Sequence, residues 1–299
     1  MGRTAILTCL IAAASLMVAC SHDVATVPSF DGARAYADLE RQVAFGPRVP
    51  GTDTHIETRD WLLGRLRDTA SRAALQEFSG QSAGRDVPMY NIIASFSPEK
   101  TERVLLCAHW DSRPFADKDP DPANHSQPVP GANDGASGVA VLLEVARILN
   151  AHEPPVGVDI VLFDGEDGGS YGGSDGWLLG SRYFAGAMPE SYKPRYAVLL
   201  DMIGDSDLKL TPDAASQGMA TAVWQRAERI ARDLNINIDA KTIQILDDHV
   251  PLIERGIPAI DLIDFDYPPW HTVGDTPDKC SPESLGLIGS LVLTMIYGE

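Results

Sequence analysis

The sequence has few cysteines: four among 299 residues, at positions 9, 20, 107 and 280. The first two fall in an N-terminal segment that we expect to be processed, which leaves Cys107 and Cys280 for the folded protein. Two cysteines so far apart in the sequence do not by themselves indicate a disulfide. We therefore expect both thiols to be unpaired, and Cys107, inside an apolar run, to act as a small hydrophobic residue.

Basic residues are also scarce, since 24 lysines and arginines stand against 42 acidic residues, for a net charge of −18. Binding to nucleic acid depends on clusters of lysine and arginine that neutralise phosphates. The charge balance therefore argues against nucleic acid as a partner. The acidic excess is typical of a well-solvated surface, and it is compatible with a weak preference for cationic or neutral substrates.

A long hydrophobic run is missing as well. The most apolar stretch, residues 5–18, is too short for a membrane-spanning helix but is typical of an export signal. It leads into a segment ending at Cys20 that resembles a bacterial lipobox, except that Met17 replaces the usual leucine. We expect residues 1–19 to be a lipoprotein signal peptide and Cys20 to carry lipid; the alternative is an ordinary secretory signal cleaved nearby. The protein is thus predicted to be exported to the bacterial cell envelope, lipid-anchored or periplasmic, with membrane contact only through that lipid.

The rest of the chain has the pattern of one domain. Residues 20–30 are a predicted tether, and residues 31–299 contain no internal repeat and, at 44% hydrophobic residues for the whole chain, enough apolar side chains for a large core. Predicted strands cover residues 75–78, 90–96, 104–108, 158–163, 196–200 and 259–263. Predicted helices cover residues 31–42, 54–69, 137–150, 215–234, 250–255 and 282–297. This alternation predicts a single three-layer α/β domain, with a mostly parallel central sheet and helices on both faces.

Potential metal ligands follow several of these strands. His109, Asp167 and Asp201 each stand at or just beyond the end of an apolar run, Asp134 lies in a glycine-rich loop before a helix, and His271 lies in a late loop. Because ligand sites in such sheets lie at the carboxyl ends of the strands, we expect these five side chains to line one pocket. Carboxylates and imidazoles together suit a divalent cation such as zinc.

Each of these residues has a simpler explanation when taken alone. Asp134 could cap the following helix, and a histidine that ends a buried strand is often a hydrogen-bonded core residue. Glu166 and Asp167 could form a solvated acidic turn. Two adjacent acids could instead have different roles: one can bind metal while the other, with a raised pKa, acts as a general acid or base. Their occurrence together favours the metal site. Four other histidines lie in polar contexts that suggest exposure and no role: His22, His55, His125 and His152.

The order of these motifs makes the pattern more specific. The chain contains AHWDS, GANDGASG, FDGED, LLDMIGD, DDHVPLIERGIP and WHT, in that order. From about residue 31 to the C-terminus it resembles the zinc-dependent M28 peptidase family, which groups aminopeptidases with glutaminyl-peptide cyclotransferases (glutaminyl cyclases). The resemblance implies the three-layer fold of zinc aminopeptidases and related phosphorylase/hydrolase-like proteins, and a substrate that is a peptide or protein N-terminus. We also expect a monomer.

The two branches of that family imply different metal sites. In the aminopeptidase branch two zinc ions share an aspartate, and Glu166 would be the general base. The ligands would then be His109, Asp134, Asp167, Asp201 and His271. The chain has Asp167 where both branches usually carry glutamate, and a shorter ligand there would displace the metal slightly.

In the cyclase branch the resemblance implies a single zinc ion. Asp134, Asp167 and His271 would hold it, while Glu166 shuttles a proton. Asp201 and Asp247 would then belong to a hydrogen-bond network around Glu166.

Several features favour the cyclase branch. Trp270 directly precedes His271 and could form an apolar wall for a small side chain, although ordinary packing would also explain it. The segment beginning at Asp247, together with LLDMIG and GSRYF, also resembles the cyclases. One feature counts against them, because the loop after Asp167 lacks their tryptophan, for which Trp177 could substitute. We expect a zinc-dependent glutaminyl-peptide cyclotransferase, with a dizinc aminopeptidase as the alternative and a non-catalytic binding lipoprotein as a third hypothesis.

Overall fold

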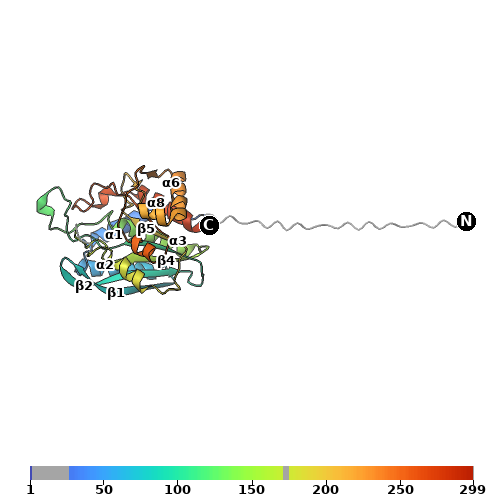
Figure 1. Ribbon diagram of the computed structural model, residues 1–299, viewed down its shortest axis with the longest axis horizontal. Helices are drawn as coiled ribbons and strands as arrows, with labels where there is room; N and C mark the ends of the chain where they lie inside the picture. The colour runs from blue at the N-terminus through green and yellow to red at the C-terminus, as the bar shows by residue number, and fades with distance from the viewer. Residues whose placement is uncertain (2–26, 171–174, 299) are drawn as a thin grey trace.

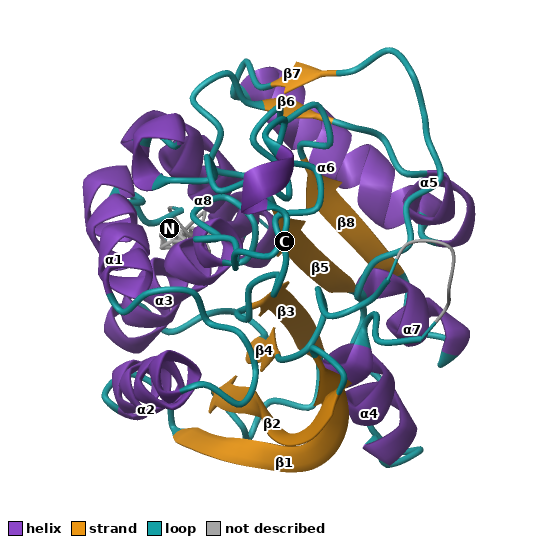
Figure 2. Cartoon of the chain, turned by 90° about the vertical axis from the view of Figure 1, so that its left-hand side faces the viewer, coloured by secondary structure: helices purple, strands orange, loops and turns teal. Residues whose placement is uncertain are grey.

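The central feature of the computed structural model is a six-stranded sheet between two layers of helices (Figures 1 and 2). The structure describes residue 1 and residues 27–170 and 175–298. The predicted signal peptide, the lipid-carrying Cys20 and most of the predicted tether therefore lie outside the described residues. Among the helices that are described, none is both long enough and apolar enough to cross a membrane.

The sheet contains both parallel and antiparallel strands, and the candidate metal ligands lie at the end of its parallel part. Its strand order is β1-β2-β4-β3-β5-β8; the last four strands pair in parallel, and β1 and β2 form an antiparallel hairpin that joins them through β2. The strands are β1 (Arg72–Ser82), β2 (Arg85–Phe96), β3 (Arg103–His109), β4 (Gly157–Phe163), β5 (Ala197–Asp201) and β8 (Ala259–Ile263). Two short strands, β6 (Lys209–Leu210) and β7 (Asn237–Ile238), pair outside this sheet. The predicted α/β fold with a mostly parallel sheet is confirmed.

Helices cover both faces of the sheet (Figure 2). One layer contains α1 (Gly32–Ala44), α2 (Asp53–Arg67), α3 (Ala136–Ala151), α6 (Thr221–Asp233) and α8 (Pro282–Tyr297). The other contains α4 (Leu179–Ala187) and α7 (His249–Glu254), and α5 (Ala214–Met219) packs beside β8. In β3, Val104 and Leu106 pack toward the first layer while Leu105 and Cys107 pack toward the second. Burial on both sides explains why these strands are continuous apolar runs rather than alternating ones.

Some predicted elements differ from the observed ones. The single helix predicted at 215–234 is wrong: α5 ends at Met219 and α6 begins at Thr221, because Ala220 leaves the helical conformation (φ −127°, ψ 37°). The strand predicted at 75–78 is part of a longer hairpin, whose turn has positive φ at Ala83 and Gly84, as a two-residue hairpin turn requires. Cys107 and Cys280 are buried and unpaired, as predicted.

Candidate active site

The five candidate ligands converge at the carboxyl edge of the parallel strands. His109 ends β3, Asp201 ends β5, Asp167 follows β4, Asp134 lies just before α3, and His271 lies in the loop after β8. All five are buried. The pocket beside them is lined by Asp134, Glu166, Asp167, Trp177, Asp201, Met202, Gln244, Ile245, Leu246, Asp247, Ile263, Phe265, Trp270 and His271. The β-strand register thus brings together residues that the sequence places far apart.

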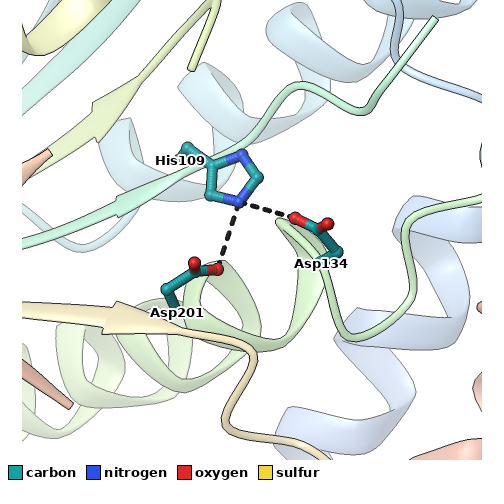
Figure 3. A group of neighbouring side chains, drawn as sticks. All are labelled: His109, Asp134 and Asp201. Carbon is teal, nitrogen blue, oxygen red and sulfur yellow. Dashed lines mark hydrogen bonds and ion pairs between the residues drawn. The ribbon is translucent and has the colours of Figure 1, made fainter. Parts of the chain in front are cut away.

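Asp134 joins two clusters of potential ligands. Its Oδ1 lies 3.1 Å from His109 Nε2, which is also 3.2 Å from Asp201 Oδ1 (Figure 3). Its Oδ2 lies 3.5 Å from His271 Nε2, which is 3.2 Å from Asp167 Oδ1. Within each cluster of three residues the ligand atoms are all within 4.8 Å of one another. The arrangement has room for one ion in the His271 cluster, one in the His109 cluster, or two that share Asp134.

Both histidines have a carboxylate on the far side of the ring. His109 Nδ1 lies 3.5 Å from Asp111 Oδ1, and His271 Nδ1 lies 3.8 Å from Asp117 Oδ1. A carboxylate in this position favours a proton on Nδ1 and leaves Nε2 as the lone-pair donor to a metal. Asp111 also accepts hydrogen bonds from the backbone N–H groups of Glu166 and Asp167, at 3.1 and 3.2 Å. The same side chain therefore lies beside one ligand and fixes the loop that carries another.

Asp134 itself is held by Asp275, which the sequence analysis missed. The Asp275 carboxylate accepts the backbone N–H groups of Asn133 (2.8 Å) and Asp134 (3.1 Å) and the hydroxyl of Tyr267 (2.7 Å). The alternative role of Asp134 as a helix cap is wrong, because Gly135 is the N-cap residue of α3 and no side chain caps it. The signal that the sequence offers for Asp275 is its position shortly after the candidate ligand His271.

Orphaned oxygens show that the clusters fit a cation. Asp134 Oδ2 and Asp167 Oδ2 are buried and have no hydrogen-bond partner within the described chain. Unsatisfied buried carboxylate oxygens are costly, and a bound divalent ion would compensate for them. Two carboxylates and an imidazole Nε2 form a ligand set that zinc accepts, with a coordination position left for substrate.

The acids beside the ligands are tuned toward proton transfer. Glu166 is partly buried, and burial together with the negative charge of Asp167 raises its pKa well above the ordinary value. Burial and the charge of Asp201 raise the pKa of Asp247 to about 7, and burial also raises the pKa of Asp201. Carboxyl groups with raised pKa values can exchange protons near neutral pH, which suits general acid–base chemistry.

Two tryptophans flank His271 in the pocket. The Trp270 ring centre lies 4.0 Å from that of His271, and the Trp177 ring lies 6.4 Å away and nearly parallel to it, with an angle of 12° between the planes. Trp177 thus lines the pocket, where the sequence analysis suggested it as a substitute aromatic residue. His271 and Met202 also have positive φ values, 56° and 46°, a strained conformation that clusters at functional sites.

One histidine was misjudged from the sequence. His55, expected to be exposed, is fully buried, and its Nε2 lies 2.9 Å from the Asp164 carboxylate. Its ring stacks on Trp110 with centres 4.4 Å apart. The polar neighbours of His55 in the sequence do not reveal this tertiary contact. The residue packs in the interior and does not line the pocket.

Comparison with known proteins agrees with this architecture. The chain matches Peptidase family M28 over residues 91–296, and it belongs to that family. It is 28% identical to the glutaminyl-peptide cyclotransferase-like protein of Mus musculus, over 84% of this chain and 72% of that protein.

Two solved structures extend the comparison. The glutaminyl cyclase of Bacteroides thetaiotaomicron, solved with N-acetylhistamine, has a TM-score of 0.87 at 36% identity, covering 92% of this chain and all of that one. A Zn-dependent exopeptidase from Parabacteroides distasonis has a TM-score of 0.86 at 38% identity, with the same coverage. The chain is thus an enzyme of a zinc-dependent family whose members include both activities.

Proposed function

We propose that the protein is a zinc-dependent glutaminyl-peptide cyclotransferase, which converts an N-terminal glutamine to pyroglutamate and releases ammonia. The observation that carries the proposal is the position of Glu166. This carboxyl group, with its raised pKa, lines the same pocket as the Asp134–Asp167–His271 cluster and the two tryptophans. The similarity to named glutaminyl cyclases supports it.

Asp134, Asp167 and His271 would hold the metal in this account. A zinc ion bound there supplies Lewis acidity that polarises the γ-carbonyl of the substrate glutamine. Trp177 and Trp270 would enclose the aliphatic part of that side chain. The pocket would fold the glutamine side chain toward its own α-amine, and this proximity of the reacting groups would account for most of the rate acceleration.

Glu166 would move the proton. It takes a proton from the substrate α-amine as that nitrogen bonds to the carbonyl carbon of the side-chain amide, and it then gives the proton to the departing amide nitrogen, which leaves as ammonia. One C–N bond forms and one breaks, and no water is consumed. Asp201 and Asp247 would keep Glu166 in place and in a suitable protonation state.

One observation favours a second function, that of a dizinc aminopeptidase. The His109–Asp134–Asp201 cluster is as complete as the His271 cluster, so the chain offers ligands for two ions. In that case Glu166 would activate a water molecule, and the first amino acid would be released by hydrolysis.

The two functions yield different products from one peptide. A peptide that begins with glutamine is incubated with zinc-loaded protein and analysed by mass spectrometry, with chelator-treated protein and a Glu166→Gln variant as controls. Loss of one ammonia from an otherwise intact peptide supports the cyclotransferase. Release of free glutamine with a shortened peptide contradicts it and supports the aminopeptidase.

We further propose that the enzyme acts in the bacterial cell envelope as a monomer, anchored through lipid on Cys20 or free in the periplasm. Fractionation of cells that express the wild type and a Cys20→Ala variant tests the anchor. The lipoprotein hypothesis predicts that the wild type is in the membrane fraction and the variant is not.

A further inference from the structure

Arg113 lies in the loop that follows β3, and its side chain is 2% exposed. Its Nη1 donates to the backbone oxygen of Asp167 at 3.0 Å and to Asp167 Oδ1 at 3.1 Å. Its Nε and Nη2 donate to the two carboxylate oxygens of Asp117, at 2.8 and 2.6 Å. One guanidinium thus binds both a candidate metal ligand and a second carboxylate.

The partners of Arg113 also contact His271, a second ligand of the Asp134–Asp167–His271 cluster. Asp117 faces Nδ1 of His271 at 3.8 Å, and the backbone N–H of Lys118 donates to the carbonyl of His271 at 3.1 Å. The guanidinium carbon also lies 4.9 Å from the ring centre of Trp177, whose ring is parallel to that of His271. All these partners lie on the His271 side of the pocket.

The contact with Arg113 fixes the orientation of the Asp167 carboxylate, whose Oδ1 also faces His271 Nε2 at 3.2 Å. Oδ1 accepts from Arg113, whereas Oδ2 is buried and lacks a hydrogen-bond partner in the described chain. A planar guanidinium holds carboxylates in a fixed geometry, which the flexible single ammonium of lysine does not reproduce. Partners that orient metal ligands in this way contribute about 10- to 100-fold to metal affinity.

We propose that Arg113 is a positioning residue of the metal centre. It fixes Asp167 directly and His271 through Asp117, so that both ligands meet one ion with Asp134, and it supports the Trp177 wall of the pocket. The inference rests on the metal centre of the proposed function but is independent of whether the product is pyroglutamate or a free amino acid.

Zinc affinity tests this proposal without using activity. Zinc is titrated against a chromogenic chelator for the wild type, Arg113→Met and Arg113→Lys, and the absorption spectrum of the Co²⁺-loaded protein is recorded for each. We expect Arg113→Met to weaken zinc binding about 10- to 100-fold and to alter the Co²⁺ spectrum. Arg113→Lys keeps the charge but loses the paired hydrogen bonds, so its zinc affinity should lie between those of the wild type and Arg113→Met.

A matched control separates positioning from loss of stability. Arg103 also donates to both oxygens of a carboxylate, that of Asp159, at 2.8 and 2.6 Å, but at the start of β3, far from the ligands along the strand. Arg103→Met should lower Tm and leave the zinc Kd and the Co²⁺ spectrum unchanged.

Wild-type zinc affinity and an unchanged Co²⁺ spectrum in Arg113→Met would overturn the inference. If that variant does not fold, as judged by circular dichroism, Arg113→Lys decides the matter, and wild-type affinity there would overturn it equally. If the product assay shows hydrolysis while Arg113→Met still loses zinc, the cyclotransferase proposal fails and the role of Arg113 stands.

Discussion

Nε2 of His271 lies 3.2 Å from Oδ1 of Asp167, although the two residues belong to loops that follow different strands, β8 and β4. This contact exists because both strands run in the same direction in the parallel part of the sheet and end at one edge. Neither residue is near the other in sequence, so the metal cluster depends on the whole sheet being formed.

Replacing the proposed proton shuttle should remove activity without removing the metal. Glu166→Gln keeps the size of the side chain but cannot accept the amine proton, so we expect kcat to fall by about 10²- to 10⁴-fold. Zinc content, measured by elemental analysis, should stay at the wild-type value. Turnover at the wild-type rate would show that another group carries the proton.

Truncating each histidine separately should reveal how many ions bind. If one zinc is held by Asp134, Asp167 and His271, His271→Ala loses stoichiometric zinc while His109→Ala retains it. The two substitutions remove the same chemical group, so each controls for the other. If the wild type binds two ions and each variant keeps one, the single-zinc arrangement is wrong and the aminopeptidase alternative gains support.

The buried acids should make the metal-free protein less stable as the pH rises. The pKa of Asp247 is raised from 3.8 to about 7, and that of Asp264 from 3.8 to about 6, mainly by burial. Between the unfolded pKa of 3.8 and these raised values, the folded state therefore binds more protons than the unfolded state. This contribution to stability is complete below about pH 4 and is lost as the pH rises through about 7.

Thermal unfolding of the chelator-treated protein measures this effect. We expect Tm to be at least ~2 °C higher at about pH 5 than at about pH 8, because ~1 kcal/mol corresponds to a few degrees in a domain of this size. Asp247→Asn should reduce the difference, since an amide does not titrate. A Tm that rises with pH in the metal-free protein would contradict the assigned protonation states.

The aromatic walls should act on substrate binding more than on chemistry. Removing the Trp270 ring loses apolar contact equivalent to ~1 kcal/mol, so Trp270→Ala should raise KM roughly several-fold to tenfold with a smaller change in kcat. Trp61→Ala is the control, because Trp61 lies in α2, outside the pocket, and packs on Phe45. Equal effects of the two substitutions on KM would argue against Trp270 as a substrate wall.

Much of the fold is predictable because local patterns and tertiary structure agree. The strands β3, β4, β5 and β8 are buried on both faces, so their short continuous apolar runs located them in the sequence. The candidate ligands could be predicted for a related reason, since residues that end parallel strands must share an edge. By contrast, α4 was not predicted. The residue before it, Leu178, has a left-handed conformation (φ 58°), and the helix itself contains two glycines.

The residues that orient the ligands could not be predicted in this way. Asp111, Asp117, Arg113 and Asp275 act through contacts between loops, and the loop paths depend on the assembled sheet. A polar residue in a loop has the same sequence pattern whether it faces solvent or a ligand, so pattern alone gave them no role.

The most direct test is to locate the metal. Crystals of the zinc-loaded protein, measured at the zinc absorption edge, would give an anomalous peak at each bound ion. We expect a peak within coordination distance, about 2.0–2.2 Å, of Asp134, Asp167 and His271 together. Zinc bound elsewhere, with no peak among these three side chains, would contradict this expectation.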